Sequence, residues 1–381
     1  MLFALSLLPA FLYLLLIIDA LWGYRKPWWL REVPIPSRAV WPLVSIVAAA
    51  RNEERKIAEG VRSLLALDYP AMELVVIDDR STDRTGEVLQ GIAATDPRLR
   101  IVTVRELPPH WLGKNHALQL GADEAKGELL LFTDADVVLE PTCLKRAVAY
   151  MEESSIDHLT CAPEMTGGTL ALRMFVAAFS LFFSMYARPW KAPDPKSRAH
   201  VGVGAFNLLR TALYRKFGGH SRIAMRPDDD MKLGKLVKLA GGSQRFISGA
   251  GMVRVEWYST LPEAIDGLMK NSFSGVDYSY GMLIGATVVQ AWVNLWPFIG
   301  LLVCHGGVRV ASAISAGMII FVSGTFSRGG RMSPWFGFTF PISTVIFLYV
   351  LWKAAIRTSR QGGIRWRETL YPLDELRANR V

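Results

Sequence analysis

The chain begins with a long apolar segment. Residues Leu2 to Trp22 are almost wholly apolar. At about 1.5 Å per residue, a helix of this length is long enough to cross the hydrocarbon core of a bilayer. Asp19, close to the end of the segment, can lie at the interface. The segment therefore predicts a membrane helix at the start of the chain.

A cleaved signal peptide is the alternative interpretation of this segment. The sequence argues against it, because there is no basic n-region and no small-residue cleavage site. Positive charges instead follow the segment at Arg25, Lys26 and Arg31. We therefore expect a retained anchor over residues 1–24. The positive-inside rule then keeps the next domain in the cytoplasm, and we expect an integral protein of a bacterial inner membrane.

Apolar density returns after Gly275, and we expect transmembrane helices over residues 276–356. Candidate spans lie near Tyr280–Cys304, Val308–Phe326 and Trp335–Trp352. Three crossings would place the basic tail, residues 357–381, outside and against the positive-inside rule. Either one segment is re-entrant or the first span is a broken pair of short helices. Both alternatives stay open, and we expect the tail inside, packing as a juxtamembrane segment.

A shorter apolar stretch lies in the middle of the chain, from Leu172 to Ala187, and Arg173 and Arg188 flank it. We expect an interfacial or core helix there rather than a membrane span.

The composition agrees with a membrane protein, since 51% hydrophobic residues and 12 tryptophans exceed what a soluble domain usually carries. The formal charge of +9 comes from Lys and Arg residues that flank apolar runs rather than form one basic block. This pattern favours contact with lipid headgroups over binding of nucleic acid. Cys143, Cys161 and Cys304 are odd in number and far apart, so they predict neither a disulfide framework nor a metal site.

Between the apolar ends, strand-like and helical patterns alternate. Short apolar runs that suit buried parallel strands read "LVSIVAAA", "ELVVIDD", "LRIVTV" and "ELLLFTD". The stretches between them, "EERKIAEGVRSLLAL", "TGEVLQGIAA" and "NHALQLGADEAKG", have helical periodicity. The alternation predicts an α/β domain with a mainly parallel sheet.

Polar residues gather where these strands end, and open parallel sheets bind ligands at the carboxyl ends of their strands. The residues are Arg51, Asn52 and Glu53 after the first run, Asp78 and Asp79 after the second, and Asp134 and Asp136 after the fourth. Their clustering predicts a binding site at that edge of the sheet.

Asp134 and Asp136 flank one small residue at a strand end. Alternation along a strand throws both side chains to the same side, so the two carboxylates repel unless a cation lies between them. Mg²⁺ or Mn²⁺, held by the two carboxylates and by substrate phosphate oxygens, fits this pattern. A solvated turn is the alternative interpretation.

A second acidic cluster, Asp228, Asp229 and Asp230, precedes a helical pattern carried by Leu233 and Leu236. N-capping explains one aspartate at a helix start. Three in a row exceed that need, and crowding raises the pKa of at least one carboxylate, as a general base requires.

Four motifs in this order resemble the membrane-bound family 2 glycosyltransferases. They are "VSIVAAARNEE", "ELVVIDDRSTDRTGEV", "WLGKNHALQLGADEAKGELLLFTDADV" and "DDDMKLGKLVKLAG", which together cover roughly Leu43 to Gly242. The lipid-modifying branch, similar to ceramide glucosyltransferases and hopanoid-associated glycosyltransferases, resembles the chain most. The resemblance implies a cytoplasmic GT-A domain over residues 40–275.

The resemblance also implies roles for single residues. The nucleotide-contacting turn matches Ala50, Arg51, Asn52 and Glu53, and the acidic pair for base and ribose matches Asp78 and Asp79. A lysine near the donor sugar and diphosphate matches Lys114, and the metal and diphosphate motif matches Asp134 and Asp136. Asp230 matches the general base, and Asp229 is its neighbour.

The chain departs from the family at one place. Many relatives carry Gln-x-x-Arg-Trp on a helix after the base, whereas "LPEAIDGLMKNSF" has Gly267, Lys270 and Asn271 at those positions. Lys270 can still neutralise a diphosphate, but the Trp platform for an acceptor is missing. Trp257 is an alternative aromatic surface, although a buried core Trp is the simpler interpretation. The departure counts against a processive polysaccharide synthase.

Three further features have simpler interpretations. His116 and His220 have no ligand partner at helical spacing, so packing or surface roles are expected. "GVGAFN", Gly202–Asn207, lacks the third glycine and the acidic residue of a dinucleotide fingerprint. By the resemblance it lines an acceptor pocket.

The resemblance thus implies an inverting, metal-dependent enzyme that moves a sugar from a nucleotide donor, UDP-linked by expectation, to a lipid hydroxyl. Asp230 takes the proton from the hydroxyl, and Mg²⁺ or Mn²⁺ assists departure of the diphosphate. The alternatives are a processive polysaccharide synthase and an inactive membrane scaffold with the same fold. The expected partners are the donor, the lipid and the bilayer, without nucleic acid.

Overall fold

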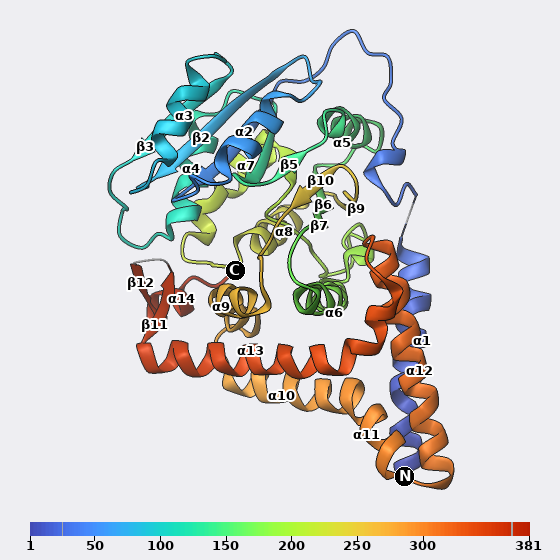
Figure 1. Ribbon diagram of the computed structural model, residues 1–381. Helices are drawn as coiled ribbons and strands as arrows, with labels where there is room; N and C mark the ends of the chain where they lie inside the picture. Colours follow the sequence, from blue (N-terminus) through green and yellow to red (C-terminus); the bar gives the residue numbers. More distant parts are fainter. Residues whose placement is uncertain (25, 367–368) are drawn as a thin grey trace. The chain divides into compact units, whose positions relative to one another are not determined.

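The structure is a computed structural model that describes residues 1–24, 26–366 and 369–381 (Figure 1). Arg25, one of the charges after the first apolar segment, and residues 367–368 of the expected juxtamembrane tail lie outside the described residues. The chain divides into two compact units. The sheet unit comprises Arg25–Thr166, Arg188–Glu256 and Ala378–Val381, and the helical unit comprises Met1–Tyr24, Gly167–Ala187 and Trp257–Arg377.

A seven-stranded sheet forms the centre of the sheet unit, in the order β3-β2-β1-β4-β8-β6-β9. Strands β3, β2, β1 and β4 are mutually parallel, and β8 runs antiparallel between β4 and β6. The strands are β1 (Val44–Ala50), β2 (Met72–Asp79), β3 (Leu99–Val104), β4 (Leu129–Asp134), β6 (His158–Ala162), β8 (Asn207–Arg210) and β9 (Gln244–Ser248). The four predicted apolar runs are the four parallel strands β1 to β4, which confirms the mainly parallel α/β sheet.

Helices cover both faces of this sheet. Because side chains alternate along a strand, Ile46 of β1 packs into one buried cluster with α2, α3 and α5, and Val47 packs into another with α4, α7 and α8. The helices are α2 (Ile57–Leu65), α3 (Thr85–Ala93), α4 (Gly113–Glu124), α5 (Cys143–Glu153), α7 (Thr211–Phe217) and α8 (Asp229–Leu239). This three-layer arrangement explains why the strands read as continuous apolar runs.

Smaller elements complete the sheet unit. A second sheet has the order β5-β10-β7, from β5 (Val138–Leu139), β10 (Val253–Val255) and β7 (Glu164–Met165). Short 3₁₀ helices are η1 (Leu30–Glu32), η2 (Pro189–Lys191) and η3 (Gly219–Ile223).

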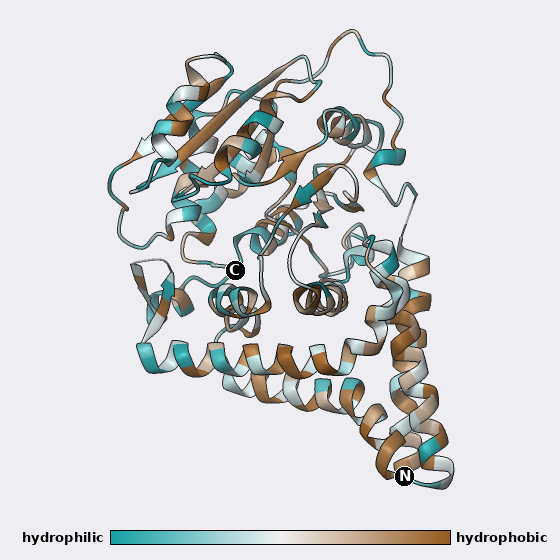
Figure 2. Ribbon diagram, viewed as in Figure 1, coloured by the Kyte–Doolittle hydropathy of each residue, from teal (hydrophilic) through white to brown (hydrophobic). Residues whose placement is uncertain are grey.

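Long apolar helices dominate the helical unit (Figure 2). Its elements are α1 (Leu2–Gly23), α6 (Leu170–Ala187), α9 (Leu261–Ser272), η4 (Ser274–Val276), α10 (Tyr280–Gln290), the π-helical turn η5 (Ala291–Leu295), α11 (Trp296–Val303), α12 (Gly306–Gly329), η6 (Pro334–Thr339), α13 (Phe340–Gln361), β11 (Gly363–Trp366), β12 (Thr369–Pro372) and α14 (Leu373–Ala378). Among the described residues, five helical stretches are long and apolar enough to cross a membrane: Leu2–Gly23, Leu170–Lys191, Tyr280–Val303, Gly306–Gly329 and Pro334–Gln361. The expected apolar helices at both ends of the chain are therefore present, while the interfacial helix near residue 172 and the crossing parity stay predictions.

Pro9 interrupts the hydrogen-bond ladder of α1, and neighbouring helices repair it. Proline has no N–H, so the carbonyl of Leu5 loses its helical partner, and the indole N–H of Trp292 donates to that carbonyl at 3.1 Å. One turn on, Ser315 Oγ donates to the Ser6 carbonyl at 2.7 Å and accepts from the Ala10 N–H at 3.2 Å. These bonds fix α1 against α12 and against the π-helical turn.

Candidate active site

The candidate site lies at the carboxyl ends of β1, β2 and β4. Strand β1 pairs with β2 on one side and with β4 on the other, so the chain leaves the sheet in opposite directions from neighbouring strands. Such a topological switch point opens a crevice for ligands in an α/β sheet. The polar residues predicted at the strand ends all lie at this edge.

The loops after β1 and β2 are locked together. Asn52, with φ of 54°, accepts a hydrogen bond from Thr82 N at 2.8 Å, and its own N–H donates to Ser81 Oγ at 3.1 Å. The N–H of Glu53 donates to Thr85 Oγ1 at 2.8 Å. The nucleotide-contacting turn predicted at Ala50 to Glu53 is thus held by the "RSTDRT" loop.

Asp78 and Asp79 end β2, but their carboxylates have different environments. Arg80 Nε lies 2.7 Å from Asp79 Oδ1 and Arg80 Nη2 lies 2.9 Å from Asp79 Oδ2, a two-pronged ion pair. Asp78 Oδ1 is buried and accepts no hydrogen bond from any described residue. A buried acceptor without a donor is costly in a folded protein. Of the two acidic residues, Asp78 is therefore the one positioned to accept a hydrogen bond from a ligand.

Arg51 directly follows β1 and carries a similar unmet hydrogen-bonding group. Its Nε is buried and donates to no other residue within the described part of the chain. A donor and an acceptor without protein partners thus lie in the segments that end β1 and β2. Such a pair suits a ligand that carries both acceptors and donors, as a nucleoside does.

Lys114, in the first turn of α4, is the cation of the site. Its Nζ lies 2.9 Å from Asp134 Oδ1 and 3.5 Å from Asp229 Oδ2. Burial alone would lower the pKa of Lys114, but the charges of Asp134, Asp229 and Asp230 outweigh it and raise that pKa. The lysine therefore stays charged and joins the end of β4 to the start of α8.

Asp136 lies in the turn that follows β4. Burial, together with the negative charges of Asp134 and Glu53, raises the pKa of Asp136 to about 6. No three His, Cys, Asp or Glu side chains are grouped as a ready-made metal site within the described residues. Two crowded carboxylates nevertheless fit Mg²⁺ or Mn²⁺, which take only one or two protein carboxylates when phosphate oxygens complete the coordination. Asp134 and Asp136 remain the predicted metal ligands.

The three consecutive aspartates at the start of α8 have three different partners. Asp228 pairs with the buried Arg226, through Nε–Oδ1 at 2.8 Å and Nη2–Oδ2 at 2.9 Å, and its Oδ2 lies 3.7 Å from Lys232 Nζ. Asp229 faces Lys114. Asp230 Oδ2 accepts a hydrogen bond from Gly204 N at 2.9 Å. Only Asp230 has no cation as its direct partner in these contacts.

Burial, together with the negative charge of Asp229, raises the pKa of Asp230 to about 7, although Lys114 opposes the rise. A carboxylate with this pKa is a competent proton acceptor near neutral pH. Asp230 therefore has the properties that the sequence predicted for the base, although its role stays a prediction.

The "GVGAFN" segment comes unusually close to α8. A Cβ atom at Gly202 would lie 1.8 Å from the Asp230 carbonyl oxygen, and one at Gly234 would lie 2.1 Å from the Val201 carbonyl oxygen. Glycine at these positions lets the two segments touch backbone to backbone. The glycines thus place Gly204 N at Asp230.

The sequence also predicts a donor contact for Lys270. It belongs to α9 of the helical unit, where its Nζ lies 4.0 Å from the centre of the Trp366 ring. Trp257, in the same unit, packs against Phe179 with ring centres 5.1 Å apart. A donor-binding role for Lys270 stays a prediction.

The sequence reasoning missed several residues of the site. Arg80, Arg226 and Asn115 orient its acidic residues and loops, and Gly204 binds Asp230. Arg80 and Arg226 stand beside or near an aspartate in sequence, which is a usable signal for an ion pair. Asn115 and Gly204 act across long sequence distances and leave no such signal.

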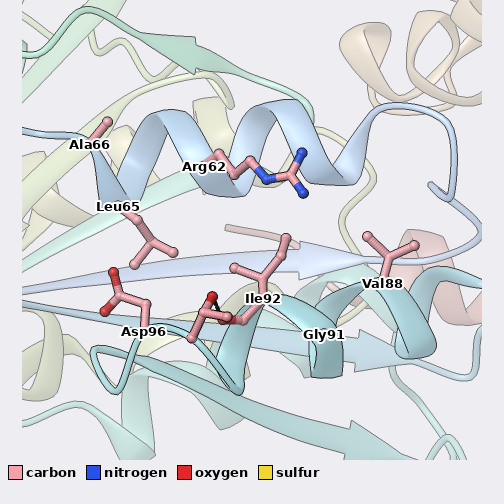
Figure 3. A pocket seen from close by; sticks show the side chains of 8 residues that line it. Arg62, Leu65, Ala66, Val88, Gly91, Ile92 and Asp96 are labelled. Atoms are coloured by element: carbon pink, nitrogen blue, oxygen red, sulfur yellow. Dashed lines mark hydrogen bonds between the residues drawn. The ribbon is translucent and has the colours of Figure 1, made fainter.

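A separate pocket lies between α2 and α3 (Figure 3). Its lining includes Arg62, Val88 and Asp96, and no candidate site residue contributes to it.

Comparison with known proteins decides the family. Residues 45–218 match the family model described as "Glycosyl transferase family 2". The chain carries a glycosyl transferase family 2 domain. The match runs from β1 into the turn after α7, so it includes the strand-end residues and Lys114. Asp229 and Asp230 lie beyond it.

The chain is similar over parts of its length to curated proteins named as glycosyltransferases and to one named as a synthase. The chain is 35% identical over 264 residues to the 4,4'-diaponeurosporenoate glycosyltransferase of Staphylococcus haemolyticus, covering 68% of this chain and 66% of that protein. It is 34% identical over 125 residues to the beta-monoglucosyldiacylglycerol synthase of Synechocystis sp., covering 32% and 26%. The chain spans about a quarter to a half of the length of the first curated relatives that it matches.

The fold resembles that of a solved glycosyltransferase. The mannosyltransferase PcManGT from Pyrobaculum calidifontis, in complex with GDP-Man and Mn²⁺, aligns with a TM-score of 0.56 at 18% identity, covering 93% of this chain and 99% of that one. The expectation of a GT-A fold is confirmed.

Proposed function

We propose that this family 2 glycosyltransferase transfers a sugar, with inversion, from a nucleoside diphosphate donor to a lipid hydroxyl at the cytoplasmic face of a membrane. UDP is the nucleotide we favour. The observation that carries the proposal is the arrangement around Lys114, whose Nζ lies 2.9 Å from Asp134 and 3.5 Å from Asp229, next to the proton acceptor Asp230. The proposal assigns to Lys114, Asp134 and Asp230 the roles of cation, metal ligand and base.

Donor binding follows from the groups that lack partners. Asp78 Oδ1 accepts from the imide N–H of a base or from a ribose hydroxyl, and Arg51 Nε donates to the nucleotide. Asp79 is already paired with Arg80, so it orients the loop rather than binding the ribose directly. The hydrogen-bonded loops after β1 and β2 hold this end of the site rigid.

Asp230 performs the proton transfer. With its pKa near 7, it is largely ionised at slightly alkaline pH and takes the proton of an acceptor hydroxyl as the oxygen attacks the anomeric carbon. Gly204 N–H fixes the carboxylate, and Lys114 limits the rise of its pKa. Attack from the face opposite the leaving diphosphate inverts the anomeric centre.

Asp134 and Asp136 would hold the divalent metal. When bound there, Mg²⁺ or Mn²⁺ supplies positive charge to the departing diphosphate. Lys114, beside Asp134, adds a fixed charge to the same place.

A lipid acceptor is supported by two observations. Five helical stretches are long and apolar enough to cross a membrane, and relatives are named for transfer to diaponeurosporenoate or for making a glucosyldiacylglycerol. The positive charges after the first helix support the cytoplasmic face.

The test is transfer of label from a panel of radiolabelled UDP- and GDP-sugars, with membranes that contain the protein and with matched membranes that lack it. The proposal predicts label in the chloroform phase from one donor, and an anomeric configuration in the product opposite to that of the donor by NMR. Label in a chloroform-insoluble polymer would instead identify a polysaccharide synthase. Absence of transfer and hydrolysis with every donor would support an inactive scaffold.

A further inference from the structure

The loop that leads into α8 is held mainly by other segments. The loop, residues 222–228, precedes the first turn that carries Asp229 and Asp230. Asn115 is fully buried, and its Nδ2 lies 2.8, 3.1 and 2.9 Å from the carbonyl oxygens of Ile223, Ala224 and Arg226. Asn115 directly follows Lys114, so this contact ties the base-bearing loop to the helix that carries the cation.

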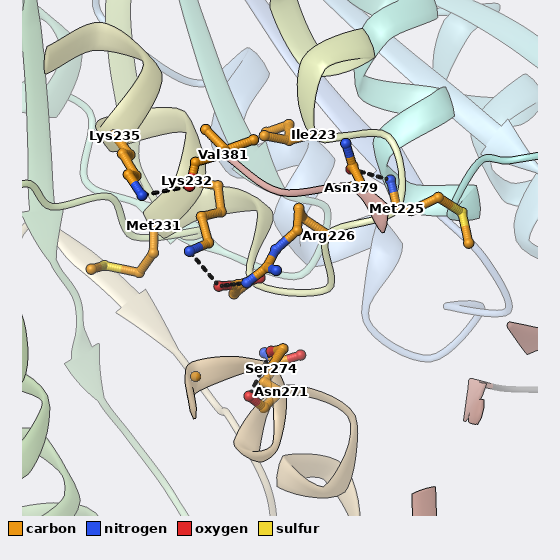
Figure 4. Close-up of polar contacts among 12 residues, drawn as sticks. Ile223, Met225, Arg226, Met231, Lys232, Lys235, Asn271, Ser274, Asn379 and Val381 are labelled. Atoms are coloured by element: carbon orange, nitrogen blue, oxygen red, sulfur yellow. Dashed lines mark hydrogen bonds and ion pairs between the residues drawn. The ribbon is translucent and has the colours of Figure 1, made fainter. Parts of the chain in front are cut away.

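The last residues of the chain hold the same loop from another direction (Figure 4). The Oδ1 atom of Asn379 accepts from Met225 N at 2.9 Å, and its Nδ2 donates to the Arg222 carbonyl at 3.1 Å. The side chain of Asn379 therefore bridges two points of the loop backbone. An amide is the side chain that suits this task, because it offers a donor and an acceptor together.

Two further contacts attach this segment to α8. Lys235 Nζ donates to the Val381 backbone oxygen, and the Val381 side chain packs against the buried cluster that includes Ile223, Leu233 and Leu236. Four contacts thus come from residues 378–381, which belong to the sheet unit although the preceding helix α14 starts in the helical unit. Asn379 and Val381 supply all four contacts, and we call these two residues the C-terminal clamp.

We propose that the C-terminal clamp positions the first turn of α8, and that Asn379 is a positioning residue for the proton transfer by Asp230. The inference rests on the proposed function. The physical reason for this inference is geometric. A base acts only within a narrow range of positions relative to the acceptor hydroxyl, so a displacement of about 1 Å can reduce the rate about 100-fold. Without Asn379, the Met225 N–H and the Arg222 carbonyl lose their partners, and the loop gains freedom directly before the base.

The test compares the purified full-length Asn379→Leu and Asn379→Asp variants with Arg380→Ala. Arg380 is the exposed neighbour, and its backbone N–H donates to the Ala378 carbonyl at 2.9 Å. We expect kcat to fall about 10- to 100-fold in Asn379→Leu while the KM for the nucleotide sugar stays within about two-fold. Asn379→Asp keeps an acceptor for Met225 N and should fall less. Arg380→Ala should match the wild type.

Hydrogen exchange supplies a readout that does not depend on catalysis. Peptides covering residues 222–228 should exchange faster in Asn379→Leu and at the wild-type rate in Arg380→Ala. Unchanged exchange, or faster exchange with unchanged kcat, would overturn the clamp. Parallel losses of kcat, donor affinity and thermal stability would also overturn it, since they indicate a general structural role. An inactive wild type would contradict the proposed function, whereas the exchange comparison still decides whether the clamp holds the loop.

Discussion

The backbone N–H of Gly204 donates a 2.9 Å hydrogen bond to Oδ2 of Asp230. Gly204 precedes β8, and Asp230 lies in the first turn of α8, so this bond joins the middle of the sheet to the predicted base. A side chain at Gly204 would enter the site itself, because its Cβ would lie 3.0 Å from Asp134 Oδ2 and 3.4 Å from Lys114 Nζ.

Gly204→Ala should therefore impair catalysis more than folding. Each contact is tight but involves a side chain that can shift slightly, so we expect stability to change by no more than about 1 kcal/mol and kcat to fall at least about 10-fold. Kinetics and thermal unfolding of the same preparation measure both. Gly202→Ala is the matched comparison, because its Cβ would lie 1.8 Å from the Asp230 carbonyl oxygen, and it should destabilise by about 1–3 kcal/mol. Full activity of Gly204→Ala would contradict the geometry of the site.

Activity should rise with pH through about 7, since Asp230 must be ionised to accept a proton and burial raises its pKa to about 7. Lys114 stabilises the ionised form. Lys114→Met should move the midpoint of the pH–kcat profile to higher pH and also raise the KM for the donor, because the diphosphate loses a cation. The profile is measured for both proteins between pH 5 and 9, chosen as roughly two units on either side of neutrality. An unchanged midpoint in Lys114→Met would show that Asp230 is not the group whose ionisation controls kcat.

Asp230→Asn should stabilise the protein at alkaline pH. The pKa of Asp230 is raised in the folded state from 3.8 to about 7, so the folded protein binds more protons than the unfolded chain between these values. The free energy of unfolding therefore falls as pH rises through this window. Asparagine does not titrate, so the variant should gain on the order of 1–3 kcal/mol relative to the wild type at pH 8 and little at pH 4. A variant that is less stable than the wild type at pH 8 would contradict a raised pKa of Asp230 in the folded protein.

Ser315→Ala should loosen α1 in the helical unit. Ser315 Oγ donates to the Ser6 carbonyl and accepts from the Ala10 N–H, both in the part of α1 that contains Pro9. Loss of both bonds should cost about 1–2 kcal/mol. Ser327→Ala on the same helix is the control, because its hydroxyl donates to the Ser323 carbonyl of its own helix, and it should change stability by less than about 0.5 kcal/mol. Thermal unfolding in detergent compares the two variants. Equal losses of stability would argue against a special stabilising role for the Ser315 hydrogen bonds beside Pro9.

Much of the sheet could be predicted from the sequence, because its parallel strands are buried on both faces and carry continuous apolar runs. Asp78, Asp134 and Asp136 were identifiable for a related reason: charged residues directly after such runs have to lie at the sheet edge. The antiparallel insertion of β8 between β4 and β6 was not foreseeable, since neither periodicity nor composition records which strands pair across the chain.

The different partners of the three aspartates at α8 could likewise not be predicted from the sequence. Asp228 is paired with Arg226, Asp229 with Lys114, and Asp230 with a backbone N–H. Only folding brings Lys114 and Gly204 to them. The same holds for Asn379, whose partners lie more than 150 positions earlier in the chain.

The most direct test of the central claim compares purified wild type and Asp230→Asn, reconstituted in lipid, in a single experiment that measures nucleotide binding and sugar transfer. The account predicts that both proteins bind the nucleoside diphosphate with the same affinity within about two-fold, because Asp78 and Arg51 are unchanged. Transfer of labelled sugar to chloroform-soluble lipid should fall at least about 1,000-fold in Asp230→Asn, as loss of a positioned base requires. Transfer by Asp230→Asn within about 10-fold of the wild type would contradict the assignment of Asp230 as the base.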